Sequence, residues 1–255
     1  MSGTPDVGWP LAAVLVVLVV AAVLITRAGR LGVERDQLTA AVRAVVQLAV
    51  VSLVIAAVLE SMWGSFAFVV VMYLVATATV SRRLDVPLRQ TGWVALAIVA
   101  GAGPVVALCL GSGVIPLNGA GVIPVAGIVI GGAMTAATLT GRRAADELTA
   151  HHSTYEAAVA LGLPSPEAAY LTFEPTAREA LLPGLDQTRT VGVVTLPGAF
   201  IGVLLGGGTP VEAGAAQVLV LFGLMAAQAA SCAVLLRLVA SARVVRRDLA
   251  PVFPR

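Results

Sequence analysis

Charged residues are scarce in this chain of 255 residues. Asp, Glu, Lys and Arg together make up 12% of the sequence, whereas soluble domains carry about 25%. Hydrophobic residues reach 58%, and the mean hydropathy is +0.96. Because the apolar residues fall in long uncharged blocks, lipid is their expected solvent. The composition therefore predicts an all-α integral membrane protein and excludes an ordinary soluble globule.

Lysine is absent, and all 16 basic residues are arginine. A phosphate-binding P-loop ends in Gly-Lys-Ser/Thr, so this chain cannot hold one, and any ATP hydrolysis requires another chain. The two cysteines, Cys109 and Cys232, lie in separate apolar blocks and form no CxxC pair. His151 and His152 are adjacent and do not share a helix face. We expect no enzyme active site, no cofactor and no nucleic-acid partner, and a metal site stays unknown.

Seven apolar blocks are long enough to cross a bilayer, which takes about 20 helical residues. A stretch rich in Gly, Pro and Asn at 111–119 divides the longest uncharged run into two of them. The predicted spans are 7–26, 44–59, 61–81, 90–110, 121–140, 190–211 and 213–236.

The arginines follow a pattern along these spans. They occur in every second connection, at 27–43, 82–89, 141–189 and 237–255, and are absent from the other connections. Cytoplasmic loops are enriched in basic residues, so the pattern predicts an N-terminus outside and a C-terminus in the cytoplasm. The leader 1–8 carries only Asp6 as a charge, which favours a retained span over a signal peptide.

The segment 141–188 is the only polar region long enough to fold outside the membrane. It predicts a helix over 144–161, a break at 162–166, and a second helix over 167–182 with Ser165 as its cap and a kink at Pro175. Two interpretations are open: an ordinary surface loop, or a helix-turn-helix element on which a soluble partner docks.

Several motifs resemble those of known transporters. Residues 156–162 (EAAVALG) resemble the EAA motif of ABC-transporter permeases, although Glu174-Pro175 stands where that motif has Leu-Pro. Residues 43–48 (RAVVQL), 122–127 (VIPVAG) and 186–198 (DQTRTVGVVTLPG) resemble, in the same order, the FetB-type family of iron-export ABC permeases, which includes plant aluminium-tolerance half-transporters.

This resemblance implies a multi-pass permease of the inner (plasma) membrane, acting as a homodimer with a separate ABC ATPase and exporting a metal ion such as iron. In that family the EAA-like segment is the coupling helix that sits in a groove of the ATPase. The implied contact residues here are Glu156, Ala157, Gly162, Pro164 and Pro166.

Inside the predicted spans no charge lies at mid-depth, which argues against a proton-coupled carrier. Neutral side chains remain as candidates for a translocation path, or alternatively for hydrogen bonds between helices. The path candidates are Gln47, Met134, Thr135, Thr138, Gln217 and Gln228. The ladder Gly198, Gly202 and Gly206 is typical of tight helix packing, and Pro104, Pro124 and Pro197 would kink or interrupt their helices.

Three rival functions stay open at this point. A secondary carrier or channel would work without nucleotide, a membrane scaffold would bind partners without transporting anything, and an ABC importer would require an extracellular binding protein. The sequence gives neither the substrate nor the direction of transport.

Overall fold

The computed structural model describes residues 8–251, so the leader residue Asp6, the first residue of the predicted span 7–26 and the tail residue Arg255 lie outside the described part. The described residues form ten α-helices and three short 3-10 helices, with no β-strand. Six helices are long and apolar enough to cross a membrane. The chain divides into two compact units, Met1–Val58 and Leu59–Arg255.

The first unit contains α1 (Trp9–Ala28) and most of α2 (Glu34–Glu60). A short turn joins them, in which Arg30 and Gly32 both have positive φ angles. Across this turn the Thr26 hydroxyl donates a hydrogen bond of 3.0 Å to Oε1 of Gln37. The predicted span 44–59 is thus the second half of a helix that begins at Glu34 and carries Arg35 and Arg43.

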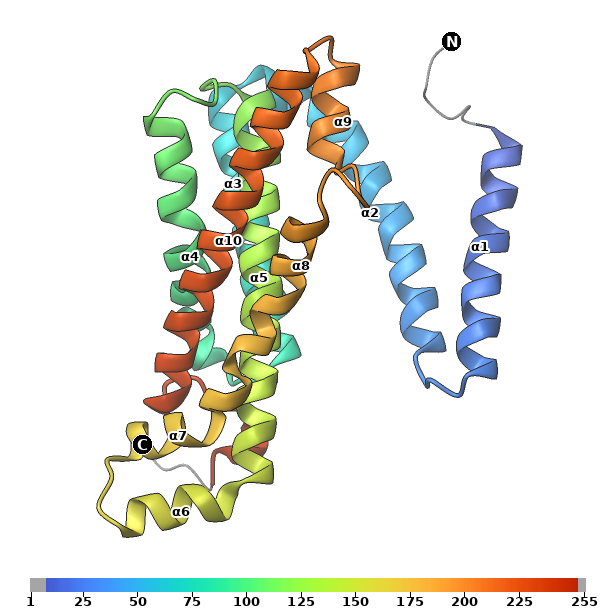
Figure 1. Cartoon of the computed structure of the whole chain (residues 1–255). Helices are drawn as coiled ribbons and strands as arrows, with labels where there is room; N and C mark the ends of the chain where they lie inside the picture. Colours follow the sequence, from blue (N-terminus) through green and yellow to red (C-terminus); the bar gives the residue numbers. More distant parts are fainter. Residues whose placement is uncertain (1–7, 252–255) are drawn as a thin grey trace. The chain divides into compact units, whose positions relative to one another are not determined.

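The second unit is built on four long helices that pack side by side (Figure 1). They are α3 (Met62–Arg83), α4 (Thr91–Gly111), α5 (Gly119–Ala150) and α10 (Pro210–Ala240). Their shared core includes Val80, Ile98, Val129 and Leu235. Small residues let these helices approach closely; a side chain at Gly101 of α4 would collide with the Ala227 carbonyl of α10. Four predicted spans therefore correspond to these four helices.

Polar caps explain where three of these helices begin. Ser61 and Asn118 accept hydrogen bonds from the amides of Gly64 and Gly121, at the starts of α3 and α5. Thr209 and Glu212 form a reciprocal capping box at the start of α10. Each cap satisfies backbone donors that the first turn leaves without partners.

The predicted span 190–211, which Pro197 was expected to kink or interrupt, is not one helix. Helix α8 (Leu182–Thr190) ends where that span should start, and α9 (Gly198–Leu205) has only eight residues. Between them, Gly192 has φ +80° and donates a hydrogen bond of 2.9 Å to the Thr195 carbonyl. Three features interrupt the helix here. The segment is rich in β-branched residues, Gly192 lies in the left-handed region, and Pro197 lacks an amide hydrogen.

The polar segment 141–188 is helical, but its boundaries differ from the predicted ones. Helix α5 runs on to Ala150, α6 (His152–Ala160) starts after a break at His151, and α7 (Ser165–Ala177) follows a turn. A 3-10 helix, η2 (Arg178–Leu181), leads into α8. Ser165 is not the cap of α7, because Pro164 occupies that position and Ser165 is already helical.

Candidate functional site

A cavity of about 990 Å³ lies within the second unit, among α5, α9 and α10. The first turns of α5 supply Ala120, Gly121 and Pro124, while α10 supplies a stripe from Glu212 to Leu224. The interrupted segment contributes Pro197, and α9 contributes Gly198 and Gly202. Of the three prolines expected to kink or interrupt spans, Pro104, Pro124 and Pro197, the last two line this cavity, whereas Pro104 lies inside α4.

Polar side chains are few on the cavity wall. Among the described residues, those with polar side chains that line it are Gln187, Glu212 and Gln217. Gln217 is only 5% exposed, and within residues 8–251 its Oε1 has no hydrogen-bond partner. Oε2 of Glu212 accepts hydrogen bonds from the amide and the hydroxyl of Thr209, at 2.8 and 2.9 Å. The cavity is therefore a mainly apolar space whose wall carries two carboxamide side chains, those of Gln187 and Gln217.

The six path candidates from the sequence do not share this cavity. Of them, only Gln217 lines it. Gln228 lies farther along α10, against Gly184 and Gly132. Thr135 and Thr138 donate hydrogen bonds to the carbonyls of Gly131 and Met134 in their own helix.

The two remaining path candidates are also placed elsewhere. Met134 packs against the core of the four-helix bundle. Gln47 is exposed on α2, in the other unit. Gln187 and Gly202 line the cavity but were not among the path candidates, although Gln187 lies in the motif 186–198 and Gly202 in the glycine ladder.

The five predicted coupling residues come together at one exposed tip, formed by α6, α7 and the turn between them (Figure 1). The inner faces of α6 and α7 pack through Tyr155, Ala158, Ala169 and Phe173 onto α5 and the end of α10. The outer side exposes the five predicted coupling residues, which are Glu156, Ala157, Gly162, Pro164 and Pro166. Gly162 has φ +94°, a left-handed conformation that favours glycine.

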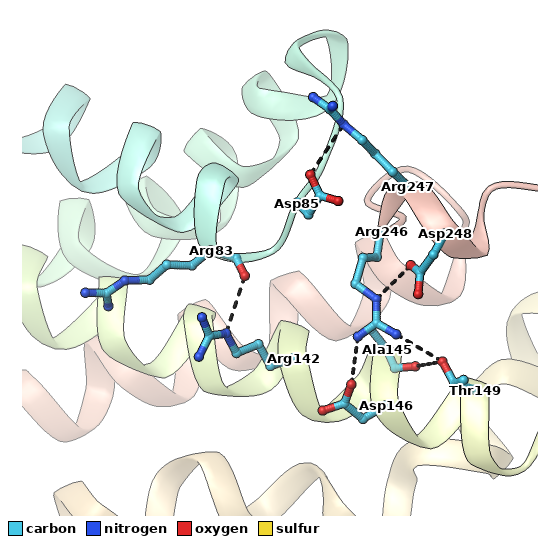
Figure 2. Close-up of polar contacts among 9 residues, drawn as sticks. All are labelled: Arg83, Asp85, Arg142, Ala145, Asp146, Thr149, Arg246, Arg247 and Asp248. Carbon is cyan, nitrogen blue, oxygen red and sulfur yellow. Dashed lines mark hydrogen bonds and ion pairs between the residues drawn. The ribbon is translucent and has the colours of Figure 1, made fainter. Parts of the chain in front are cut away.

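A cluster of arginines and aspartates fixes the base of this tip (Figure 2). Arg246, beyond the end of α10, lies 2.7 Å from Asp146 on α5 and 2.7 Å from Asp248. It also donates to the Thr149 hydroxyl at 3.1 Å. Arg247 reaches Asp85 in the turn after α3, through an ion pair of 3.5 Å and a backbone hydrogen bond of 3.1 Å.

These contacts place three arginine-rich connections at one end of the second unit: the turn after α3, the extension of α5 and the segment after α10. Arg142 on α5 adds a further link by donating to the Arg83 carbonyl at 3.3 Å (Figure 2).

The hydrogen bond between Arg246 and Asp248 lowers the pKa of the Asp248 carboxyl, and the same bond raises the pKa of Arg246. Both shifts favour the charged pair.

Among residues 8–251, no group of three or more His, Cys, Asp or Glu side chains is arranged to hold a metal ion. His151 and His152 instead pair with Glu147 and Glu156, at 3.0 and 3.1 Å. Cys232 is buried against the Thr140 hydroxyl. The described part thus contains helices long and apolar enough to span a membrane, an apolar cavity and a protruding helix pair, which define a polytopic membrane protein.

The chain belongs to a family of such proteins: residues 9–243 match the uncharacterised protein family UPF0014. A rice relative (Oryza sativa subsp. japonica), the UPF0014 membrane protein STAR2, is 32% identical over 224 residues, covering 87% of this chain and 78% of its own. The protein of Escherichia coli (strain K12) named "Probable iron export permease protein FetB" is 29% identical over 84% of this chain and 83% of its own.

The Arabidopsis thaliana protein ALUMINUM SENSITIVE 3 is 29% identical, over 83% of this chain and 78% of its own. The predicted resemblance to the FetB-type family and to plant aluminium-tolerance proteins is thus confirmed. No solved structure matches the chain.

Proposed function

We propose that this chain is the membrane subunit of an ABC transporter, that two copies form the transmembrane body, and that a separate ATPase docks on the tip of α6 and α7. The cargo would be a metal, exported across the inner (plasma) membrane. The relative named as a probable iron export permease supports both the class and the cargo. Nucleotide would bind on the ATPase, since this chain has no lysine for a P-loop.

The exposed tip is the observation that carries the proposal. Leu161 is 83% exposed at the end of α6, beside the small residues Ala157 and Gly162. The leucine offers a partner an apolar contact, and the small residues beside it let the partner's backbone approach closely. The packed inner faces of α6 and α7 hold this surface as one rigid piece, which is what transmission of a push from a closing ATPase requires.

The proposed topology places the tip and the arginine cluster in the cytoplasm. The clustering of arginines at one end of the second unit supports this orientation, because cytoplasmic ends are enriched in basic residues. This topology needs one crossing besides the six long helices, and it precedes α10 in the chain. That crossing consists of α8, the interrupted segment 191–197 and α9. Broken helices are tolerated at membrane depth where they line a cavity, and residues of this segment line one.

Reconstitution with the ATPase encoded beside this chain tests the proposal. The chain in lipid nanodiscs should bind that ATPase and stimulate its ATP hydrolysis. Leu161→Arg should abolish both effects without unfolding the chain. Leu88→Arg is the matched control, because Leu88 is 87% exposed, like Leu161, but lies in the short helix η1 (Leu88–Gln90), outside α6 and α7; this variant should retain binding.

Two results would contradict the proposal. Flux through proteoliposomes that contain this chain alone, without nucleotide, would indicate a secondary carrier or channel. Labelling of a cysteine at position 165 from the exterior would place the tip on the wrong side for any ATPase. A requirement for an extracellular binding protein would keep the ABC class but indicate import.

A further inference from the structure

The cavity among α5, α9 and α10 is large for a metal ion. Its volume of about 990 Å³ lies at the upper end of the range for small-molecule sites, about 300–1,000 Å³. One water takes up about 30 Å³, so the space would hold an ion only with many waters or with a bulky organic ligand.

The wall chemistry does not suit a bare cation. Hard cations take about six or more oxygen ligands, usually from several carboxylates, and softer ones prefer thiolates and imidazoles. Among the described residues neither a histidine nor a cysteine lines the cavity, and the one carboxylate that does, Glu212, is engaged in the capping box with Thr209. A dehydrated cation would therefore meet mostly carbon.

The wall does offer neutral hydrogen-bonding groups. Gln217 is nine-tenths or more buried, lines the cavity and, in the described part of the chain, leaves its Oε1 without a partner. Gln187 adds a second carboxamide. Pro124 has no amide hydrogen, so the carbonyl of Ala120, four residues earlier on the same wall, lacks its helical donor. Such groups bind the oxygens and hydroxyls of an uncharged organic molecule.

We infer that the cavity takes its cargo as an uncharged organic complex, in which a metal travels as a neutral chelate and not as a bare ion. The inference rests on the proposed transport function and specifies the chemistry of its cargo. Gln217 would hydrogen-bond the ligand shell of the chelate, and the apolar walls would contact its carbon atoms. A neutral cargo also explains how a path can operate when the one carboxylate that lines it in the described part, Glu212, is already engaged in the capping box.

Binding to the full chain in nanodiscs tests this directly. The probes are tris(kojato)iron(III), a neutral complex whose three hydroxymethyl groups can donate to Oε1 of Gln217 and to the Ala120 carbonyl, ferrous iron alone and kojic acid alone, each measured with radiolabelled iron or carbon. We expect saturable binding of the neutral complex and none of ferrous iron. Gln217→Met, which keeps the size of the side chain but removes the carboxamide, should weaken binding of the complex about tenfold, the equivalent of one hydrogen bond.

Two glycines provide a matched pair of variants. At Gly202, which lines the cavity, and at Gly214, which does not, an added Cβ meets open space. Gly202→Leu would place a side chain in the cavity and should abolish binding of the complex. Gly214→Leu adds the same bulk to α10 outside the cavity and should leave binding unchanged.

Three outcomes would overturn the inference. The first is binding of ferrous iron that Gly202→Leu abolishes, and the second is no binding of the neutral complex. The third is a disulfide between two copies that carry Gly202→Cys, which would mean that the second copy fills the cavity. Stimulation of the ATPase is measured in the same nanodiscs. If stimulation persists while the complex does not bind, the cargo inference fails and the ABC function stands. If the complex binds but the ATPase is not stimulated, the ABC function fails and the binding of a neutral complex stands.

Discussion

Replacing Arg246 by methionine should loosen the base of the coupling tip. The guanidinium, only 24% exposed, makes two ion pairs of 2.7 Å and one hydrogen bond to Thr149. Its partners Asp146 and Asp248 are 65% and 57% exposed, so water screens both pairs, and each contributes about 0.2–1 kcal/mol. With about 0.5–1.5 kcal/mol for the hydrogen bond to Thr149, we expect a loss of about 1–3 kcal/mol in the free energy of unfolding.

The loss should appear first in the segment that Arg246 holds. Hydrogen exchange of the amides at 241–250 and at 145–150 should accelerate, and thermal unfolding in detergent should occur a few degrees lower. In nanodiscs with the ATPase, stimulation should fall while ATPase binding is retained, because the tip stays packed on α5 but the segment that packs with it through Val245 and Leu249 is no longer held to α5 by Arg246.

Arg247→Met is the matched control. Its side-chain ion pair with Asp85 is longer, at 3.5 Å, with both side chains 62% exposed, and the backbone hydrogen bond to the Asp85 carbonyl survives the substitution. We expect a loss below about 0.5 kcal/mol. If the two variants lose equal stability and equal ATPase stimulation, the links from Arg246 to α5 have no special role and the reasoning is refuted.

The effect of Arg246→Met should depend on pH. Because Arg246 lowers the pKa of Asp248, the stabilisation is present in full above the unfolded-state value of about 3.9 for aspartate. It is lost as the pH falls through the lower pKa of the folded state. The difference in stability between wild type and Arg246→Met should thus stay constant between about pH 8 and pH 5 and narrow below about pH 4, as thermal scans at each pH would show.

Three further predictions concern other parts of the second unit. Gly101→Val should destabilise the bundle by about 1–3 kcal/mol or more, because the added side chain meets the Ala227 carbonyl; denaturation in detergent measures it, and unchanged stability would contradict the close packing of α4 and α10. Gly162→Ala should lower the free energy of unfolding by about 1 kcal/mol, because φ +94° is strained for alanine, and it should reduce ATPase stimulation. Gly92→Ala, at a position where an added Cβ meets open space, should change neither quantity. Glu156→Gln should keep the fold and weaken ATPase binding severalfold in a pull-down titration, since this side chain is exposed; unaltered binding would remove it from the docking surface.

Hydropathy alone was sufficient to locate the six long helices, because each contains a long apolar stretch with few charges. It could not identify the interruption at 191–197, since Val191, Val193 and Val194 are as apolar in an extended segment as in a helix. Gly192 and Pro197 were visible signals, but their effect depends on what surrounds them. Likewise Gln217 and Gln228 look equivalent on one helix, and only the neighbouring helices decide which one faces the cavity.

Helix α5 connects the cavity with the coupling tip in one piece. Its 32 residues span about 48 Å at 1.5 Å per residue, well beyond a hydrocarbon core of about 30 Å. Its first turns line the cavity, and its last turns hold Asp146 and Thr149 against Arg246. Helix α10 joins the same two places.

Under the proposed coupling, a push on α6 would move α5 and α10 together. Helix α9 is the shortest of the helices that line the cavity, with only eight residues, and it follows the non-helical segment 191–197. Opening and closing should therefore occur between α9 and the pair formed by α5 and α10. A spin-label pair on α9 and α10 should change its distance when the ATPase binds nucleotide, and a pair on α5 and α10 should not.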